Sequence, residues 1–173
     1  MPKKSSTKKA VRKKKEPEFP PIEDSTMGRL SFVTQFGDGT LEYEGFVDVN
    51  GKTFQLLLCS DESKSLGTTQ RHARMHLKSY KRLIKEATDY VSAKFVPRYN
   101  REIRKQYREG LDPTDWPLLD SDDFISSMIH RSTVVHPNGN SSYWFDVGDE
   151  LQGHGLVLYR DVAKGFTTDD TPG

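Results

Sequence analysis

The sequence predicts an α+β protein in which a mostly antiparallel sheet carries helices packed on one face. Alternating apolar and polar residues at both ends of the chain indicate strands, because strand side chains point to opposite faces in turn. The middle of the chain has apolar residues at steps of three and four, the period of a helix. Strands followed by helices and then strands again are typical of this fold class.

The N-terminal segment has a composition unlike the rest of the chain. Residues 1–15 hold eight Lys or Arg and no acidic residue, and the remaining chain has 18 basic against 25 acidic residues. Like charges with almost no apolar side chains cannot offset the cost of ordering. We therefore predict a disordered basic tail over residues 1–24, a single domain over 25–168 and a frayed end over 169–173.

Three strands are expected directly after this tail. Glycines separate the first from the second, and Asn50-Gly51, a strong hairpin signal, separates the second from the third. The pattern predicts an N-terminal three-strand antiparallel meander formed by residues 29–36, 41–49 and 52–59.

A helix is expected in the middle of the chain, with Thr68 or Thr69 as its cap and Pro97 as its end or kink. A second helix is expected from there to Gly110. The apolar stripe of the first helix consists of Ala73, Leu77, Tyr80, Ile84, Ala87 and Val91.

The C-terminal third predicts a short helix over residues 121–129 and then further strands. The β-rich runs are residues 132–136, 142–147, 155–159 and 162–166. Core packing is the commonest use of aromatic side chains in such elements. We assign to the core Phe32, Phe46, Phe54, Tyr80, Trp144, Phe145 and Tyr159.

Several classes of protein do not fit the sequence. No apolar run approaches the roughly 20 residues that cross a bilayer, and the charged N-terminus lacks the apolar stretch of a signal peptide. Cys59 is the only cysteine. We expect a cytoplasmic protein, with a nuclear or nucleoid location as the alternative suggested by the basic tail, and we find no cofactor-binding motif.

Two segments carry a resemblance to a known group. PRYNREIRKQYREG and YWFDVGDELQGHGLVLY resemble a family of uncharacterised bacterial α+β domains, over about residues 40–165. Some of these domains occur near toxin-immunity loci, which implies a protein-binding role. Trp144 and Asp146 are separated by Phe145, whereas the family has that pair adjacent. The matching positions are Asp149, Glu150, His154, Gly155 and Leu156.

Two groups of residues are candidates for catalysis or metal binding. His154 lies close to Asp149 and Glu150, and a histidine beside carboxylates can act as a general base. No nucleophile or oxyanion motif accompanies it, so a surface histidine beside an acidic turn is the simpler interpretation. His72 and His76 are spaced by four, as zinc ligands on a helix are, but flanking arginines would repel a cation.

Basic residues are the strongest chemical feature of the sequence. They predict salt-dependent affinity for phosphates, although a solvated helix face explains the helical ones equally. The candidates for binding nucleic acid are Lys13, Lys14, Lys15, Arg74, Lys78, Lys81, Arg82, Arg101, Arg104 and Lys105.

The sequence thus favours a non-enzymatic interaction domain that binds an unidentified protein, with the basic tail adding weak affinity for nucleic acid or anionic surfaces. The alternatives are a nucleic-acid-binding protein that uses the tail and residues 71–108, and a hydrolase centred on His154.

Overall fold

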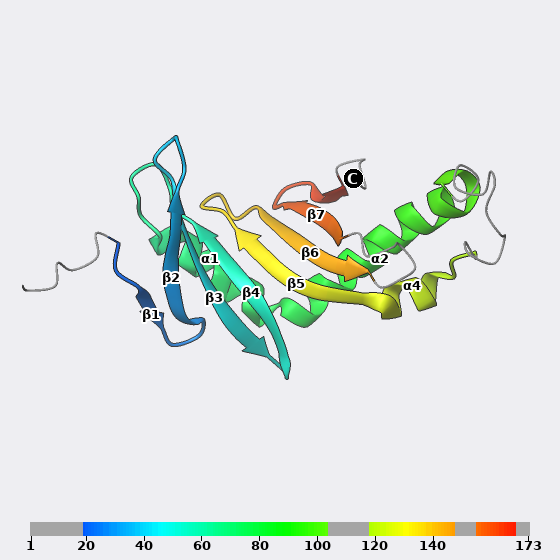
Figure 1. The fold of residues 1–173 in the computed structure, drawn as a ribbon, viewed down its shortest axis with the longest axis horizontal. Helices are drawn as coiled ribbons and strands as arrows, with labels where there is room; N and C mark the ends of the chain where they lie inside the picture. The colour runs from blue at the N-terminus through cyan, green and yellow to red at the C-terminus, as the bar shows by residue number, and fades with distance from the viewer. Residues whose placement is uncertain (1–18, 104–117, 148–154, 169–173) are drawn as a thin grey trace, which may run out of the picture.

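A computed structural model describes residues 19–103, 118–147 and 155–168, which form an α+β fold. One mixed, mostly antiparallel sheet of eight strands has the strands in chain order. The helices α1 and α2 cross behind this sheet in Figure 1. The elements are β1 Ile22–Asp24, β2 Gly28–Gln35, β3 Leu41–Val49, β4 Lys52–Cys59, α1 Gly67–Lys78, α2 Tyr80–Arg98, the π-helical turn η1 Tyr99–Ile103, α4 Ser121–Ser127, β5 Met128–Val135, β6 Ser141–Val147, β7 Gly155–Asp161 and β8 Gly165–Thr168.

Tight turns set the register of the N-terminal strands. Asn50 and Gly51 have φ of 57° and 77°, so both occupy the left-handed region that a two-residue hairpin turn requires. Val49 and Lys52 are paired across this turn, and β3 and β4 stay paired as far as Glu42 and Cys59. The hairpin predicted at Asn50-Gly51 is confirmed.

A single parallel ladder joins the two halves of the sheet. β4 pairs with β5 in parallel, from Gln55 opposite Ser132 to Leu58 opposite Val135, whereas every other neighbouring pair is antiparallel. Parallel neighbours need a crossover connection, and here α1, η1, α2 and α4 lie between the two strands in the chain.

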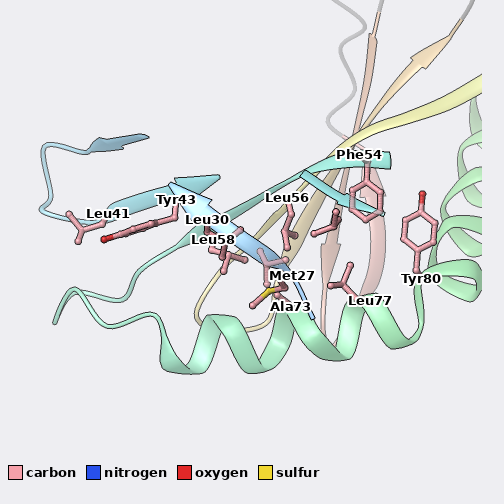
Figure 2. Close-up of a cluster of buried hydrophobic side chains, with 12 residues drawn as sticks. Met27, Leu30, Leu41, Tyr43, Phe54, Leu56, Leu58, Ala73, Leu77 and Tyr80 are labelled. Atoms are coloured by element: carbon pink, nitrogen blue, oxygen red, sulfur yellow. The ribbon is translucent and has the colours of Figure 1, made fainter. Parts of the chain in front are cut away.

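The core fills the space between one face of the sheet and the helices. Figure 2 shows strand side chains such as Leu56 and Leu58 directed toward Ala73 and Leu77 of α1. A second buried cluster joins α2 and α4 to β6 and β7, and Ile84 packs against both clusters. The predicted helical stripe faces this core: Ala73, Leu77, Tyr80, Ala87 and Val91 are buried and Ile84 is half-buried.

The helical region departs from the prediction at three points. The single long helix is divided at Ser79, whose N–H bonds to the carbonyls of Met75 and His76 and ends α1. Thr69 is not a cap, because its buried hydroxyl donates to the Cys59 carbonyl, and Leu66 stands at the N-cap position. Helix α2 runs one residue beyond Pro97, whose missing N–H removes a ladder bond, and η1 follows.

Three boundaries in the C-terminal half also differ. Helix α4 ends at Ser127, because Met128 already has extended backbone angles and begins β5. The predicted strand over 162–166 is wrong in its first half. Residues 162–164 form a turn in which the Asp161 carboxylate accepts the N–H groups of Ala163 and Lys164.

The described chain begins before the predicted domain boundary at residue 25. Phe19 lies against Phe32, with ring centroids 4.7 Å apart, and β1 pairs with β2 from Ile22 onward. The predictions for residues 1–18 and 169–173 lie outside the described residues. None of the described helices is long and apolar enough to cross a membrane.

Replacing Asp120 by Ala should lower the free energy of unfolding by about 1 kcal/mol, because Asp120 is the N-cap of α4. Its Oδ1 accepts the N–H groups of Asp122 and Asp123 at 2.8 and 3.4 Å. Urea denaturation at pH 7 measures the loss, and Asp120→Asn should retain most of the stability because its amide oxygen can also accept. An equal loss for Ala and Asn would contradict the capping role.

Candidate interaction face

The sheet face opposite the helices is the candidate functional site. Strand side chains alternate between the faces, so residues next to a core residue point away from the helices. Cross-strand register places these outward residues in rows that run across β3 to β7. We call this surface the open face and define it by Glu42, Glu44, Phe46, Asp48, Gln55, Leu57, Ser132, Val134, Ser142, Trp144, Val157 and Tyr159.

Three aromatic side chains on the open face correct the sequence interpretation, which had assigned them to the core. Phe46 is 72% exposed, Trp144 49% and Tyr159 42%. Each lies next to a core residue on its own strand, Phe46 beside buried Val47 for example, and therefore points the other way. The assignment of Phe54, Tyr80 and Phe145 to the core is confirmed, and Phe32 is partly buried against the first cluster.

The exposed aromatic residues belong to two adjacent rows. In the first row Phe46 is opposite Gln55, and continuing pairs lead through Ser132 to Trp144 and Val157. In the second row Glu44 is opposite Leu57, and the pairs lead on through Val134 and Ser142 to Tyr159. Three half-buried apolar side chains accompany the rings: Leu57 and Val134 are neighbours in the second row, and Val157 is paired with Trp144 in the first. We call Leu57, Val134 and Val157 the apolar strip.

A glycine fixes the position of the Trp144 ring. A Cβ built on Gly155 would lie 2.7 Å from Nε1 of Trp144 and 2.8 Å from two ring carbons. The indole therefore lies across the backbone of β7, where any other residue would displace it. Trp144 stays half exposed in this position, and the contact accounts for the glycine at the start of β7.

Acidic side chains border the apolar strip along β3. Glu44 accepts a hydrogen bond of 2.6 Å from Nε2 of Gln55. Asp48 accepts the Gly51 N–H and the Thr53 hydroxyl. Burial, and to a smaller extent the neighbouring Glu44 carboxylate, raise the pKa of Glu42.

A hydrogen-bonded network of histidine and tyrosine lies on the other side of the sheet, at the junction of the two core clusters. Nε2 of His130 is 2.9 Å from the Ser132 carbonyl, which can only accept, so this nitrogen carries the proton. The hydroxyl of Tyr80 therefore donates to Nδ1 of His130, 3.0 Å away. Burial lowers the pKa of His130 to about 4, with a smaller effect of Lys52.

The second half of the network joins α1 to β6. Nδ1 of His76 is 3.1 Å from the hydroxyl of Tyr143, which lies 3.3 Å from Oγ of Ser141. Burial, followed by the charge of Arg160, lowers the pKa of His76 to about 4. Both histidines are neutral at pH 7 and serve as hydrogen-bonding core residues.

The cavity beside this network is too small for a substrate. It is lined by aromatic and aliphatic side chains together with His76, Thr133 and Tyr143. The space available to the centre of a water-sized sphere is about 10 Å³, which is the lower limit for one water molecule. The network therefore has a structural role in the described fold.

The metal candidates His72 and His76 have other partners in the fold. Nδ1 of His76 lies 3.1 Å from the Tyr143 hydroxyl, and a Cβ built on Gly139 would be 3.1 Å from the ring of His72. Within residues 19–103, 118–147 and 155–168, no three His, Cys, Asp or Glu side chains come together as metal ligands.

Several of the basic candidates already have acidic partners. Arg74 pairs with Asp24, Arg82 with Glu86 at 2.7 Å, and Arg101 with Glu102 at 3.7 Å. Lys78 and Lys81 are exposed and have no ion-pair partner in the described part of the chain. Outside the described residues lie Lys13, Lys14, Lys15, Arg104, Lys105, Asp149, Glu150 and His154.

His130 is the residue that sequence reasoning missed. It shares the core face with Phe145, but Arg131 forms a bulge between His130 and Ser132 and breaks the alternation by which a core position is found. The open face was missed for another reason: both faces of β4 carry apolar residues, so alternation alone did not show which face the helices cover.

Comparison with known proteins finds no matching family model, no matching curated protein and no matching solved structure. The resemblance to uncharacterised bacterial domains therefore stays a prediction.

Proposed function

We propose that this protein is a non-enzymatic interaction domain that binds a protein partner across the open face of its sheet. The observation that carries the proposal is the exposure of Phe46, Trp144 and Tyr159 on one face of the sheet. Tryptophan and tyrosine dominate the energetics of protein interfaces, because they bury a large area at a small cost in conformational entropy.

The open face has the composition expected at the centre of an interface. The apolar strip accompanies the exposed rings, and polar or acidic side chains border it on β3. Interfaces commonly have an apolar centre and a polar rim. The strands beneath are held by continuous pairing from β2 to β8, so the surface is rigid before the partner binds.

Replacing Trp144 or Tyr159 by Ser should weaken partner binding about 30-fold or more, which corresponds to about 2 kcal/mol for a residue at the centre of an interface. A photoreactive amino acid at Phe46, which is the most exposed of the three, would first identify the partner by crosslinking. Calorimetry with the purified partner then measures the dissociation constant for each variant.

Met75→Ser provides the matched control. Met75 is 58% exposed but belongs to α1, on the opposite side of the sheet. The Met75→Ser variant should leave the dissociation constant for the partner unchanged. Urea denaturation checks that every variant is still folded under the binding conditions. The proposal would be contradicted if the Trp144 and Tyr159 variants bound the partner as tightly as the parent protein does. It would also be contradicted if Met75→Ser weakened binding as much as they do.

Binding to nucleic acid is the second candidate. The observation in its favour is the pair of exposed lysines Lys78 and Lys81 where α1 meets α2, and the sequence adds eight basic residues in 1–15. Fluorescence anisotropy of labelled duplex DNA and single-stranded RNA distinguishes it from protein binding. A nucleic-acid site on the helices would lose affinity in Lys78→Gln and Lys81→Gln and keep it in Trp144→Ser.

The proposed setting is the cytoplasm. Cys59 is buried and free, and burial raises the pKa of its thiol to about 11, which leaves it inert. A free thiol fits a reducing compartment.

A further inference from the structure

We infer that residues 1–15 of the same chain bind the open face and occupy it until a partner displaces them. The inference rests on the proposed function in one respect only, since it treats the open face as the partner's site. The occupant is a lysine- and arginine-rich segment, and the surface that it binds has both acidic and aromatic side chains.

Charge complementarity is the first argument. Residues 1–15 hold eight basic residues and no acid. On the open face, Glu42, Glu44 and Asp48 lie on alternate positions of β3 and so project from the same side of the sheet. Burial, the larger cause, and the neighbouring Glu44 carboxylate raise the pKa of Glu42, and a cation placed beside the two carboxylates would stabilise their charged forms.

The exposed rings give the second argument. A Lys or Arg side chain above the face of an aromatic ring is attracted by the electrons of that ring, and tryptophan is the best such partner. Phe46 is in the row of Trp144, and Tyr159 is in the adjacent row that begins at Glu44. Carboxylates and rings within two neighbouring rows match a segment with many cationic side chains.

The other side of the molecule would repel the same segment. Arg71, Lys78 and Lys81 are exposed on the helices that cover the opposite face. Helices α1 and α2 together carry eight Lys or Arg against the two acidic residues Glu86 and Asp89, so their net charge disfavours a basic segment.

The chain that joins the basic segment to the sheet is long enough for the segment to reach Trp144. β1 begins at Ile22 and pairs with β2, which neighbours β3. Strands are spaced by about 4.8 Å, so Trp144 on β6 is roughly 24 Å from β1 across the sheet. Phe19 is held against Phe32 of β2, so the free length is counted from the residue before it. An extended chain covers about 3.3 Å per residue, and the residues before Phe19 can span this distance more than once. Covalent linkage gives a high effective concentration, so individually weak contacts suffice.

A spin label on the basic segment tests the inference in the full chain. The Ser6→Cys variant carries a nitroxide, and buried Cys59 should not react because its thiol pKa is about 11. The reporter is the indole N–H resonance of Trp144, assigned by its loss in Trp144→Phe. At low salt we expect this resonance to lose most of its intensity relative to the sample with reduced nitroxide, and to recover at high salt.

A charge-neutral variant of the open face provides the second readout. Glu42→Gln, Glu44→Gln and Asp48→Asn together keep the side-chain shapes, and the amides can still accept the bonds from Gln55 and Gly51. The Trp144 resonance should recover in this variant, and amide resonances of Arg71 and Lys78 should be unaffected throughout. Full Trp144 intensity at low salt would overturn the inference, as would equal broadening on the helices.

Two further experiments distinguish intramolecular binding of residues 1–15 from binding between copies of the chain and from the proposed function. Mixing isotope-labelled chain without nitroxide and unlabelled chain with nitroxide detects binding between copies, and broadening there would overturn the intramolecular assignment. Replacing the eight basic residues of 1–15 by Gln should strengthen partner binding, because more molecules have the face free. If the label has no effect on Trp144 while Trp144→Ser still abolishes partner binding, only the present inference fails.

Discussion

Lowering the pH from 6.5 to 4 should remove most of the stability of this protein. Burial lowers the pKa of His76 and of His130 from 6.5 to about 4, so the unfolded chain binds protons in this window and the folded chain does not. Stability is therefore complete above pH 6.5 and falls as the pH drops toward 4. Each pKa unit corresponds to about 1.4 kcal/mol, so each histidine accounts for up to about 3 kcal/mol.

The total is comparable with the whole stability of an ordinary domain, about 5 to 15 kcal/mol. Protonation also removes the lone pair of His130 that accepts the Tyr80 hydroxyl, and it places a second positive charge near Arg160 in the case of His76. Urea denaturation at pH 7, 6, 5 and 4.5 measures how the free energy of unfolding changes with pH.

His130→Gln serves as the control. Its amide can still accept from Tyr80 and donate to the Ser132 carbonyl but does not titrate, so the dependence of stability on pH should become weaker. The rest of the histidine effect comes from His76 and from His136, whose pKa burial also lowers. Imidazole resonances of His76 and His130 that titrate near pH 6.5 in the folded protein, or an unfolding free energy that is constant from pH 6.5 to 5, would contradict the explanation.

Replacing Gly45 by Ala should destabilise the fold by about 1 to 3 kcal/mol, the range for overpacking a closely packed site. The added Cβ would lie 2.6 Å from the backbone oxygen of Arg29 and 2.7 Å from Cδ2 of Leu30, which is fully buried. The Arg29 carbonyl belongs to β2 and cannot withdraw without disturbing the pairing of Ser31 with Glu44. Thermal unfolding followed by circular dichroism measures the effect.

Gly37→Ala is the matched comparison, since a Cβ there has nothing within 4 Å and the backbone is not in the left-handed region. It should change the unfolding free energy by no more than about 0.5 kcal/mol. A Gly45 variant as stable as the Gly37 variant would show that β2 is free to move away from β3.

Local patterns predicted the parts of the fold that depend on a few neighbouring residues. The Asn50-Gly51 turn follows from the need for positive φ at both positions, and the buried stripe from Ala73 to Val91 follows from helical spacing. The division at Ser79 was missed because the stripe continues through it: Leu77 and Tyr80 are buried on either side of the break.

The candidate site could not be predicted from the residue pattern of any single strand. Trp144 is hydrophobic enough for the core, and only the placement of the helices across the sheet shows that it lies on the uncovered face. Similarly, the hydrogen bond between Tyr80 and His130 joins α2 to β5 through two residues 50 positions apart in the chain. Contacts of this kind are decided by tertiary packing and not by local propensity.

The two ends of the sheet limit how this protein can associate. In the described chain the outermost strands are β1, with three residues, and β8, with four. Each covers only part of its neighbour: β1 pairs with residues 28–30 of β2, and β8 pairs with residues 158–161 of β7. Short outer strands of this kind are a common protection against edge-to-edge aggregation, because a strand of another molecule meets no long continuous edge. A partner can therefore gain little by adding a strand to β1 or β8, and the broad surface of the sheet is the larger area left for association.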